Sequence, residues 1–133
     1  MKYLILMTFF LAACTPMHKA VSTRNVTLCE VQLDRDGYDG KSIVFRARIS
    51  SDGIENTSIW DPECRNFSLS VDHNDGSADW SDINKIIYSV GDVGTSDKII
   101  SADISGVFHK MPRNGKISVM SITKIRYSLI DKR

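Results

Sequence analysis

Two histidines and several carboxylates are the side chains of this sequence that could perform acid–base chemistry. His73 and His109 could act as general bases, but no Gly-x-Ser-x-Gly elbow, His-Glu-x-x-His helix or phosphate-binding Gly-Lys loop accompanies them. Paired carboxylates could come from Asp61, Glu63, Asp72 and Asp75. Nothing in the sequence sets the separation of these groups, and that separation decides what a carboxylate pair can do. We therefore expect no catalytic residues, no cofactor and no enzymatic activity.

The segment 72–76 has the side chains of a calcium-binding loop without its spacing. An EF-hand loop requires Gly at its sixth position and Glu at its twelfth. Counted from Asp72, Gly76 is fifth and Ile83 is twelfth. We expect a solvated loop rich in Asp and Asn. Neither Cys29 nor Cys64 has a second ligand pair at zinc spacing, so the sequence predicts no metal site.

Cys14 follows a segment with the order of a secretory signal. Lys2 precedes an apolar run over residues 4–11 that is too short to span a bilayer, which needs about 20 residues. The sequence Leu11-Ala12-Ala13-Cys14 resembles the lipobox of bacterial lipoproteins. The resemblance implies cleavage before Cys14, a diacylglyceryl group on its thiol and acylation of the new amino end. The alternative is an ordinary signal peptide followed by an incidental cysteine.

The lipobox divides the chain into residues 1–13 as signal peptide, 14–25 as lipidated tether and 26–133 as one folded domain. Two or three acyl chains give durable attachment, so we expect the partner of the N-terminus to be a membrane of the cell envelope. Residue 15 is Thr rather than Asp. Similarity to lipoproteins of two-membrane envelopes then favours the outer membrane, with the domain facing the periplasm.

Charge excludes one class of ligand. Removal of residues 1–13 leaves 120 of the 133 residues, and loss of Lys2 leaves 16 basic side chains against 16 acidic ones. A nucleic-acid-binding domain would need a basic surface on a basic chain, so we expect no nucleic-acid partner.

With Cys14 acylated, Cys29 and Cys64 remain, which in an oxidising compartment indicates one disulfide. A pair of free thiols is the alternative.

Hydrophobic periodicity predicts a mainly β domain. Residues 43–50 alternate strictly, with Ile43, Phe45, Ala47 and Ile49 on one face, as in a half-buried strand. Further strands are predicted over residues 57–60, 67–71, 100–108 and 117–127, and a helix over residues 80–90 with Asp79 as N-cap. Gly106 is placed for a β-bulge, and Thr27 with Glu30 for a capping box on a short helical segment.

The order of three strands, a helix and two strands is typical of a five-stranded antiparallel OB-like Greek-key barrel, with the helix between strands three and four. The alternative is an open antiparallel sheet with one packed helix.

Four cations should form a basic stripe if the last strand neighbours the first: Arg46, Arg48, Lys124 and Arg126. The alternative is a solvated face balanced by local acids. Trp60 should point outward, because Ile59 takes the inward position.

Four segments carry a resemblance to a family. They are Cys29-Glu30, the turn Tyr38-Asp39-Gly40-Lys41 leading into Val44 and Arg46, Asp61-Pro62-Glu63-Cys64, and Ile104-Ser105-Gly106-Val107-Phe108. Together they resemble small exported bacterial proteins of unknown function with OB-like folds. The resemblance implies that Cys29 pairs with Cys64, joining the N-terminal segment to the turn after the second strand. It implies no activity.

Two functional classes remain. The first is a noncatalytic binding module, anchored in the envelope, for a protein, a glycan or a small molecule bound through a face that includes Trp60. The second is a structural or assembly accessory of the envelope. An open groove beside Trp60 would favour the first class, and a broad exposed apolar patch the second.

Overall fold

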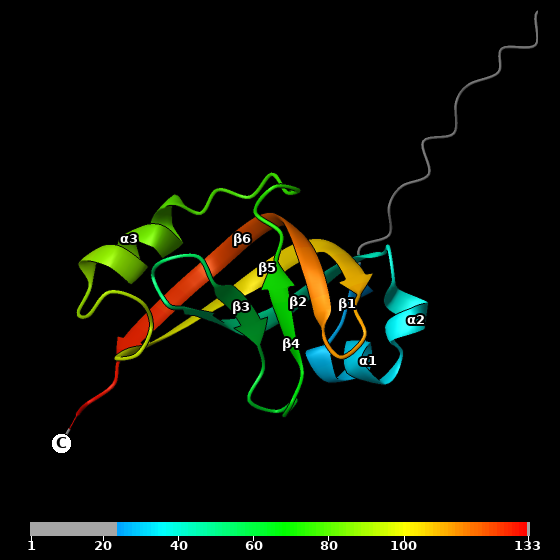
Figure 1. Ribbon diagram of the computed structural model, residues 1–133, viewed down its shortest axis with the longest axis horizontal. Helices are drawn as coiled ribbons and strands as arrows, with labels where there is room; N and C mark the ends of the chain where they lie inside the picture. The colour runs from blue at the N-terminus through cyan, green and yellow to red at the C-terminus, as the bar shows by residue number, and fades with distance from the viewer. Residues whose placement is uncertain (1–23, 133) are drawn as a thin grey trace, which may run out of the picture.

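The structure is a computed structural model that describes residues 24–132, so the export signal and Cys14 lie outside the described residues. Within this range, long strands cross to form a small barrel with short helices at its two ends (Figure 1). The elements are β1 (Arg24–Asn25), α1 (Leu28–Leu33), α2 (Arg35–Tyr38), β2 (Ser42–Ser51), β3 (Thr57–Trp60), β4 (Ser68–Val71), α3 (Ser81–Ser89), β5 (Lys98–Lys110) and β6 (Gly115–Leu129).

The barrel closes in the order β2-β3-β4-β6-β5, and β5 pairs back onto β2. Neighbouring strands of the barrel are antiparallel except β4 and β6, which run parallel where Leu69 lies beside Gly115. Helix α3 follows β4 and precedes β5, as predicted. Closure confirms the OB-like barrel and excludes the open sheet. The closed sheet also lets a small core be covered on all sides.

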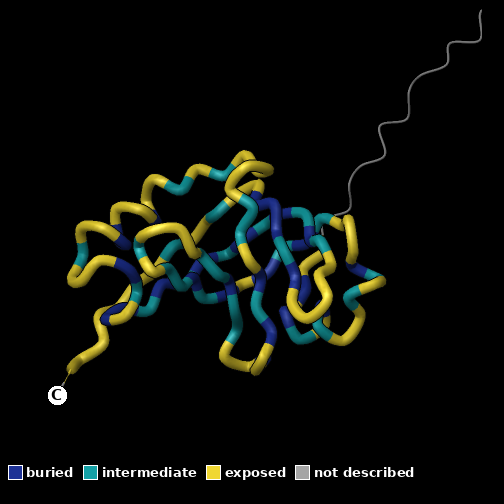
Figure 2. Tube along the Cα trace, viewed as in Figure 1, coloured by how far each residue is buried: buried dark blue, intermediate teal, exposed yellow. Residues whose placement is uncertain are grey.

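The core follows the predicted alternation of β2. Ile43, Phe45, Ala47 and Ile49 are each at most 5% exposed, and they face the buried side chains of β5. Burial of one such aliphatic or aromatic side chain contributes about 1.5–3 kcal/mol. Figure 2 shows buried positions along the strands and exposed ones gathered in the loops. Tyr38, from the turn that precedes β2, is also part of this core.

The N-terminal segment is fixed to the barrel by a short strand and a capped helix. Arg24 pairs with Ile43 in a parallel β1–β2 contact, so two residues assigned to the tether belong to the folded domain. The predicted capping box of α1 is confirmed: the Glu30 amide donates to Thr27 Oγ1 (3.2 Å), and the Thr27 amide donates to the Glu30 carboxylate (2.7 Å). Helix α2 was not predicted, because its residues have the composition of a turn.

Helix α3 packs on the barrel through the predicted stripe. Ile83 and Ile87 are buried, and Trp80 and Val90 at its two ends are partly buried. The predicted N-cap was wrong by one residue. Trp80 is the cap and supplies no side-chain hydrogen bond, whereas the carboxylate of Asp79 accepts a hydrogen bond from the Ser81 amide (2.9 Å).

A buried lysine organises the loop between α3 and β5. The side chain of Lys98 is fully buried, and its ammonium group donates to the carbonyls of Asp92 and Gly94 and lies 3.0 Å from Asp97. The Asp92 amide and the Lys98 ammonium lower the pKa of the Asp97 carboxyl. Gly91 has φ +64°, and a Cβ there would lie 2.2 Å from Asp97 Oδ2, so this turn needs glycine.

Strand β6 contains two bulges, and the segment between them is turned to the opposite face from the one that regular alternation predicts. Its register against β5 shifts between Ser105 and Gly106, where the sequence predicted a bulge, and again between Ser101 and Asp103. Each shift inserts one extra residue in β6, so the inward positions pass from Val119 to Ile122 and then to Ile125. Regular alternation from Ile117 would place Ser121 and Thr123 inward, but between the two bulges they pair with the outward Ser105 and Asp103 and are exposed. After the second bulge the alternation returns to its original phase, and Tyr127 pairs with the inward Ile100, although about half of its surface is exposed.

Candidate ligand-binding face

Trp60 ends β3 and is held by two contacts on the outside of the barrel. Ile59 is fully buried, and the partly exposed indole of Trp60 points outward, as predicted. Its Nε1 donates to Ser50 Oγ (2.7 Å). The guanidinium of Arg48 lies 5.4 Å from the ring centre, within the range of a cation–π contact. The ring is therefore positioned before any ligand arrives.

Two adjoining hollows form a groove beside Trp60. The first has a volume of about 610 Å³ and the second about 410 Å³, and Ser68 and Asn114 border both. We call their union the Trp60 groove. Each hollow has the size of a small-molecule site. The residues that line the groove are Ser58, Trp60, Asp61, Pro62, Cys64, Arg65, Asn66, Phe67, Ser68, Ser70, Met111, Pro112, Arg113, Asn114 and Gly115.

The floor of the groove is the outer face of the β3–β4 hairpin. Ser58 lies opposite Ser70, and Trp60 lies opposite Ser68, which places three hydroxyl groups and one aromatic ring on the same surface. The β5–β6 turn adds the Asn114 amide at one side. Hydroxyl and amide groups can each donate and accept hydrogen bonds, so the surface suits a ligand rich in hydroxyl or amide groups.

Sequence reasoning found Trp60 but missed the serines and Asn114. The serines alternate with apolar residues and read only as the solvent side of two short strands. Asn114 reaches them because β6 runs parallel to β4, beside Leu69 and Ser70. This pairing joins residues about 45 positions apart, and no local sequence pattern predicts it.

The four cations of the predicted basic stripe do gather on one face, although the predicted adjacency of β2 and β6 was wrong. Strand β5 lies between them. Arg48 pairs with Ser101, which pairs with Arg126, and these three residues form one row across the barrel. Arg46 lies in the next row, opposite Asp103, and Lys124 belongs to the bulge on the far side of Asp103.

Asp103 balances half of this stripe. Arg46 Nη1 lies 2.8 Å and Lys124 Nζ 3.1 Å from its two carboxylate oxygens, and both contacts lower the pKa of the Asp103 carboxyl. Within residues 24–132, neither Arg48 nor Arg126 has an ion pair, and Arg48 lies over Trp60. Two cations of the stripe thus share the single carboxylate of Asp103, and the other two have no ion pair among the described residues.

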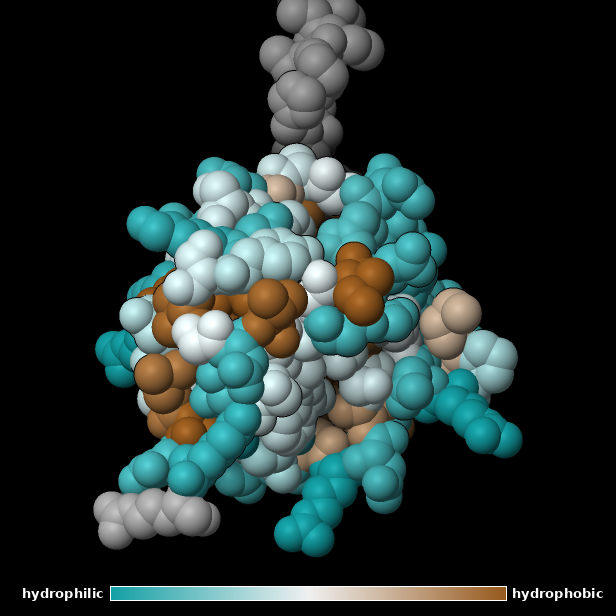
Figure 3. All heavy atoms as spheres, turned by 60° about the vertical axis from the view of Figure 1, so that its left-hand side comes forward, coloured by the Kyte–Doolittle hydropathy of each residue, from teal (hydrophilic) through white to brown (hydrophobic). Residues whose placement is uncertain are grey.

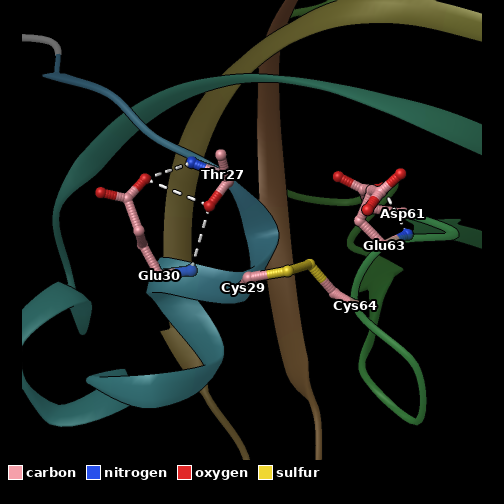
Figure 4. The surroundings of a disulfide bond; sticks show 6 residues. All are labelled: Thr27, Cys29, Glu30, Asp61, Glu63 and Cys64. Carbon is pink, nitrogen blue, oxygen red and sulfur yellow. Dashed lines mark hydrogen bonds between the residues drawn. A yellow bond between two sulfur atoms is a disulfide. The ribbon is translucent and has the colours of Figure 1, made fainter.

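A disulfide joins α1 to the wall of the Trp60 groove. Cys29 and Cys64 are bonded, with 5.1 Å between their Cα atoms, which confirms the predicted pair (Figure 4). The turn that carries Cys64 is set by Asp61, whose carbonyl accepts from the Cys64 amide and whose carboxylate accepts from the Glu63 amide, both at 2.9 Å. Cys64 is nearly buried and lines the groove.

The histidines and the polar loop make contacts that differ from catalytic ones. His109 Nε2 lies 3.2 Å from Ser118 Oγ, and that hydroxyl donates to Asp75 (2.9 Å). A catalytic triad needs the carboxylate on the histidine and the serine proton on the imidazole, so this order does not activate the serine. Asp72 is ion-paired with Lys116 (2.6 Å). Among residues 24–132, no three potential metal ligands cluster.

The fold and the groove define a small OB-like barrel with a preformed groove on its outer face that combines apolar surface with hydroxyl groups. Comparison of the chain with protein families, with curated proteins and with solved structures finds no match. No helix within residues 24–132 is long and apolar enough to cross a membrane.

Proposed function

We propose that this protein is a lipid-anchored lipoprotein of the bacterial cell envelope, and that its barrel is a noncatalytic module that binds a glycan in the Trp60 groove. The observation that carries the binding role is the groove itself, a hollow that combines a fixed indole ring with outward hydroxyl and amide groups. The anchor rests on the lipobox at Cys14. It would hold the groove within a tether length of the membrane.

The chemistry of the groove favours a sugar over an apolar ligand. Aromatic rings offer a flat apolar face, and Ser58, Ser68 and Ser70 supply hydroxyls beside it. Arg48 lines a neighbouring hollow that Trp60 also borders, whereas it does not line the Trp60 groove. The Arg48 guanidinium thus packs against one side of the Trp60 indole. The side of the indole that borders the groove is left for the ligand.

Tryptophan fluorescence tests the groove directly. In a Trp80→Phe variant, the emission reports on Trp60 alone, because the chain has two tryptophans. Titration with oligosaccharides released from bacterial envelopes should shift this emission, and Trp60→Ala should abolish binding measured by calorimetry. A Trp80→Phe protein that binds like the wild type is the matched control. Unchanged Trp60 emission and no binding heat with any fraction would refute the proposal.

A structural or assembly role is the second candidate, and one observation favours it. Apolar side chains are exposed at the end of the barrel that carries α3 and the C-terminus (Figure 3). Among them, Val93 lies against Gly53, next to Ile54. Leu129 ends β6, and Ile130 follows it with its amide bonded to the carbonyl of Asp97. A photo-crosslinker at Leu129 that captures one envelope protein, with none captured from Ser68, would support this role instead.

A further inference from the structure

A separate hollow joins the Trp60 groove to the cationic stripe. It has a volume of about 260 Å³ and is lined by Arg46, Ala47, Arg48, Asp61, Pro62 and Ser101. Asp61 and Pro62 also line the Trp60 groove, and Arg48 contacts the indole of Trp60. A ligand that extends from the groove past Pro62 therefore meets two guanidinium groups and a hydroxyl.

The positive charge at this hollow exceeds the negative charge. Arg46 is committed to Asp103, whereas Arg48 and Arg126 flank Ser101 in one row without an ion pair among the described residues. Neighbouring strands are about 4.8 Å apart, so this row spans about 10 Å. Asp61 is the carboxylate that borders the hollow, and its Oδ1 accepts from the Glu63 amide. Across the cationic stripe and this hollow together, four cations face two carboxylates, Asp61 and Asp103, which leaves an excess of two positive charges.

Guanidinium groups beside a hydroxyl are suited to binding an oxyanion group. The planar fork of arginine matches the oxygens of a carboxylate, sulfate or phosphate, and such charge-assisted hydrogen bonds are stronger than those between neutral groups. A neutral sugar would gain little from Arg48 and Arg126. A membrane headgroup layer is the less suitable occupant, because Arg48 borders a hollow and contacts an aromatic ring, Arg126 lies across Ser101 in the same row, and the mature chain carries no excess of basic residues.

We propose that the ligand of the Trp60 groove is an acidic glycan, and that Arg48 and Arg126 bind one of its oxyanion groups on either side of Ser101. This inference rests on the proposed glycan-binding function and specifies the ligand class. The neutral part of the glycan lies against Trp60 and the serines of the groove. The acidic group lies beyond Pro62, on the row that β2, β5 and β6 share.

The test compares one glycan in acidic and neutral form. The probe is a uronic-acid hexasaccharide, and its methyl ester has the same sugars without the charges. Calorimetry on the folded, non-acylated domain should show the acid binding at least about tenfold more tightly than the ester, a preference that added salt reduces. Arg126→Gln should remove most of this preference by weakening binding of the acid far more than binding of the ester. Arg48→Gln should also reduce this preference, and it should change Trp60 emission and weaken binding of the ester, because Arg48 contacts the indole ring. Lys85→Gln, at an exposed position of α3, is the charge-matched control.

The outcomes separate the two proposals. Equal binding of acid and ester, or an Arg126→Gln variant that keeps the preference, overturns the acidic-group inference and leaves the groove intact. Failure of both forms to bind overturns the glycan-binding function together with it. Vesicles of phosphatidylglycerol and of phosphatidylcholine are run in parallel. Capture by the first alone, lost in Arg126→Gln, with no hexasaccharide bound, would assign these cations to a membrane surface and overturn the inference.

Discussion

Loss of the Cys29–Cys64 bond is expected to destabilise the domain strongly. The cross-link joins residues 35 positions apart, and the chain-entropy treatment of such a loop gives about 3.8 kcal/mol at 25 °C. For a domain of this size, that corresponds to a fall in melting temperature of about 15 °C. Helix α1 has few other attachments, because Leu28 and Val31 are its buried side chains and Leu33 is exposed.

The assay is thermal unfolding of the wild type and of three variants. Cys29→Ala/Cys64→Ala should melt about 15 °C below the wild type and be insensitive to reductant, and reductant should bring the wild type down to the same value. Cys64→Ser should be less stable than Cys29→Ser by about 1–3 kcal/mol, because Cys64 is only 3% exposed and serine would bury a hydroxyl. Two free thiols in unreduced protein, or variants that melt like the wild type, would refute this reasoning.

Other perturbations have equally definite expected results. Lys98→Met should lower the melting temperature by about 10 °C or more, because the carbonyls of Asp92 and Gly94 and the carboxylate of Asp97 lose their buried cation; a variant that melts like the wild type would contradict this. Hydrogen bonds from the Ile54 amide and then from Asn56 lower the pKa of Asp52 from 3.8 to about 2. Its stabilising contribution should be full above pH 4 and lost as the pH falls toward 2, and Asp52→Asn melts should show a smaller difference from wild type at pH 2 than at pH 7. Cys14→Ala should abolish incorporation of labelled fatty acid, and a wild type that never incorporates it would rule out the anchor. Stripping metal with a chelator should leave the melting curve unchanged, and a large fall restored by calcium would show a site in the loop at 72–76.

The sequence was informative wherever structure depends on neighbours in the chain. The alternation of β2, the stripe of α3 and the capping box at Thr27 are local patterns, and all three are present in the structure. The bulge near Gly106 was also predicted. The second bulge was not predicted, because no glycine marks it and Lys124 itself adopts φ +50° there. This bulge restores the alternation that the first bulge had shifted.

Long-range relations were harder to predict. The position of β5 between β2 and β6 places Asp103 between Arg46 and Lys124, so a stripe of four cations is in part neutralised. Neither the period of a strand nor its composition states which strand lies beside it. The groove depends on the same kind of information, since its Asn114 and its serines meet only through the parallel β4–β6 contact.

The position of the disulfide has a mechanical consequence. If Cys14 holds the chain in a membrane, any pull on the anchor enters the domain at Arg24, where two residues of β1 are in shear against β2. Once that contact yields, the force is transmitted through α1 to Cys29 and across a covalent bond to Cys64, at the wall of the groove. Tension between an anchored membrane and a bound ligand would thus run along a path of covalent bonds to the binding hairpin, and the barrel would carry little of the load.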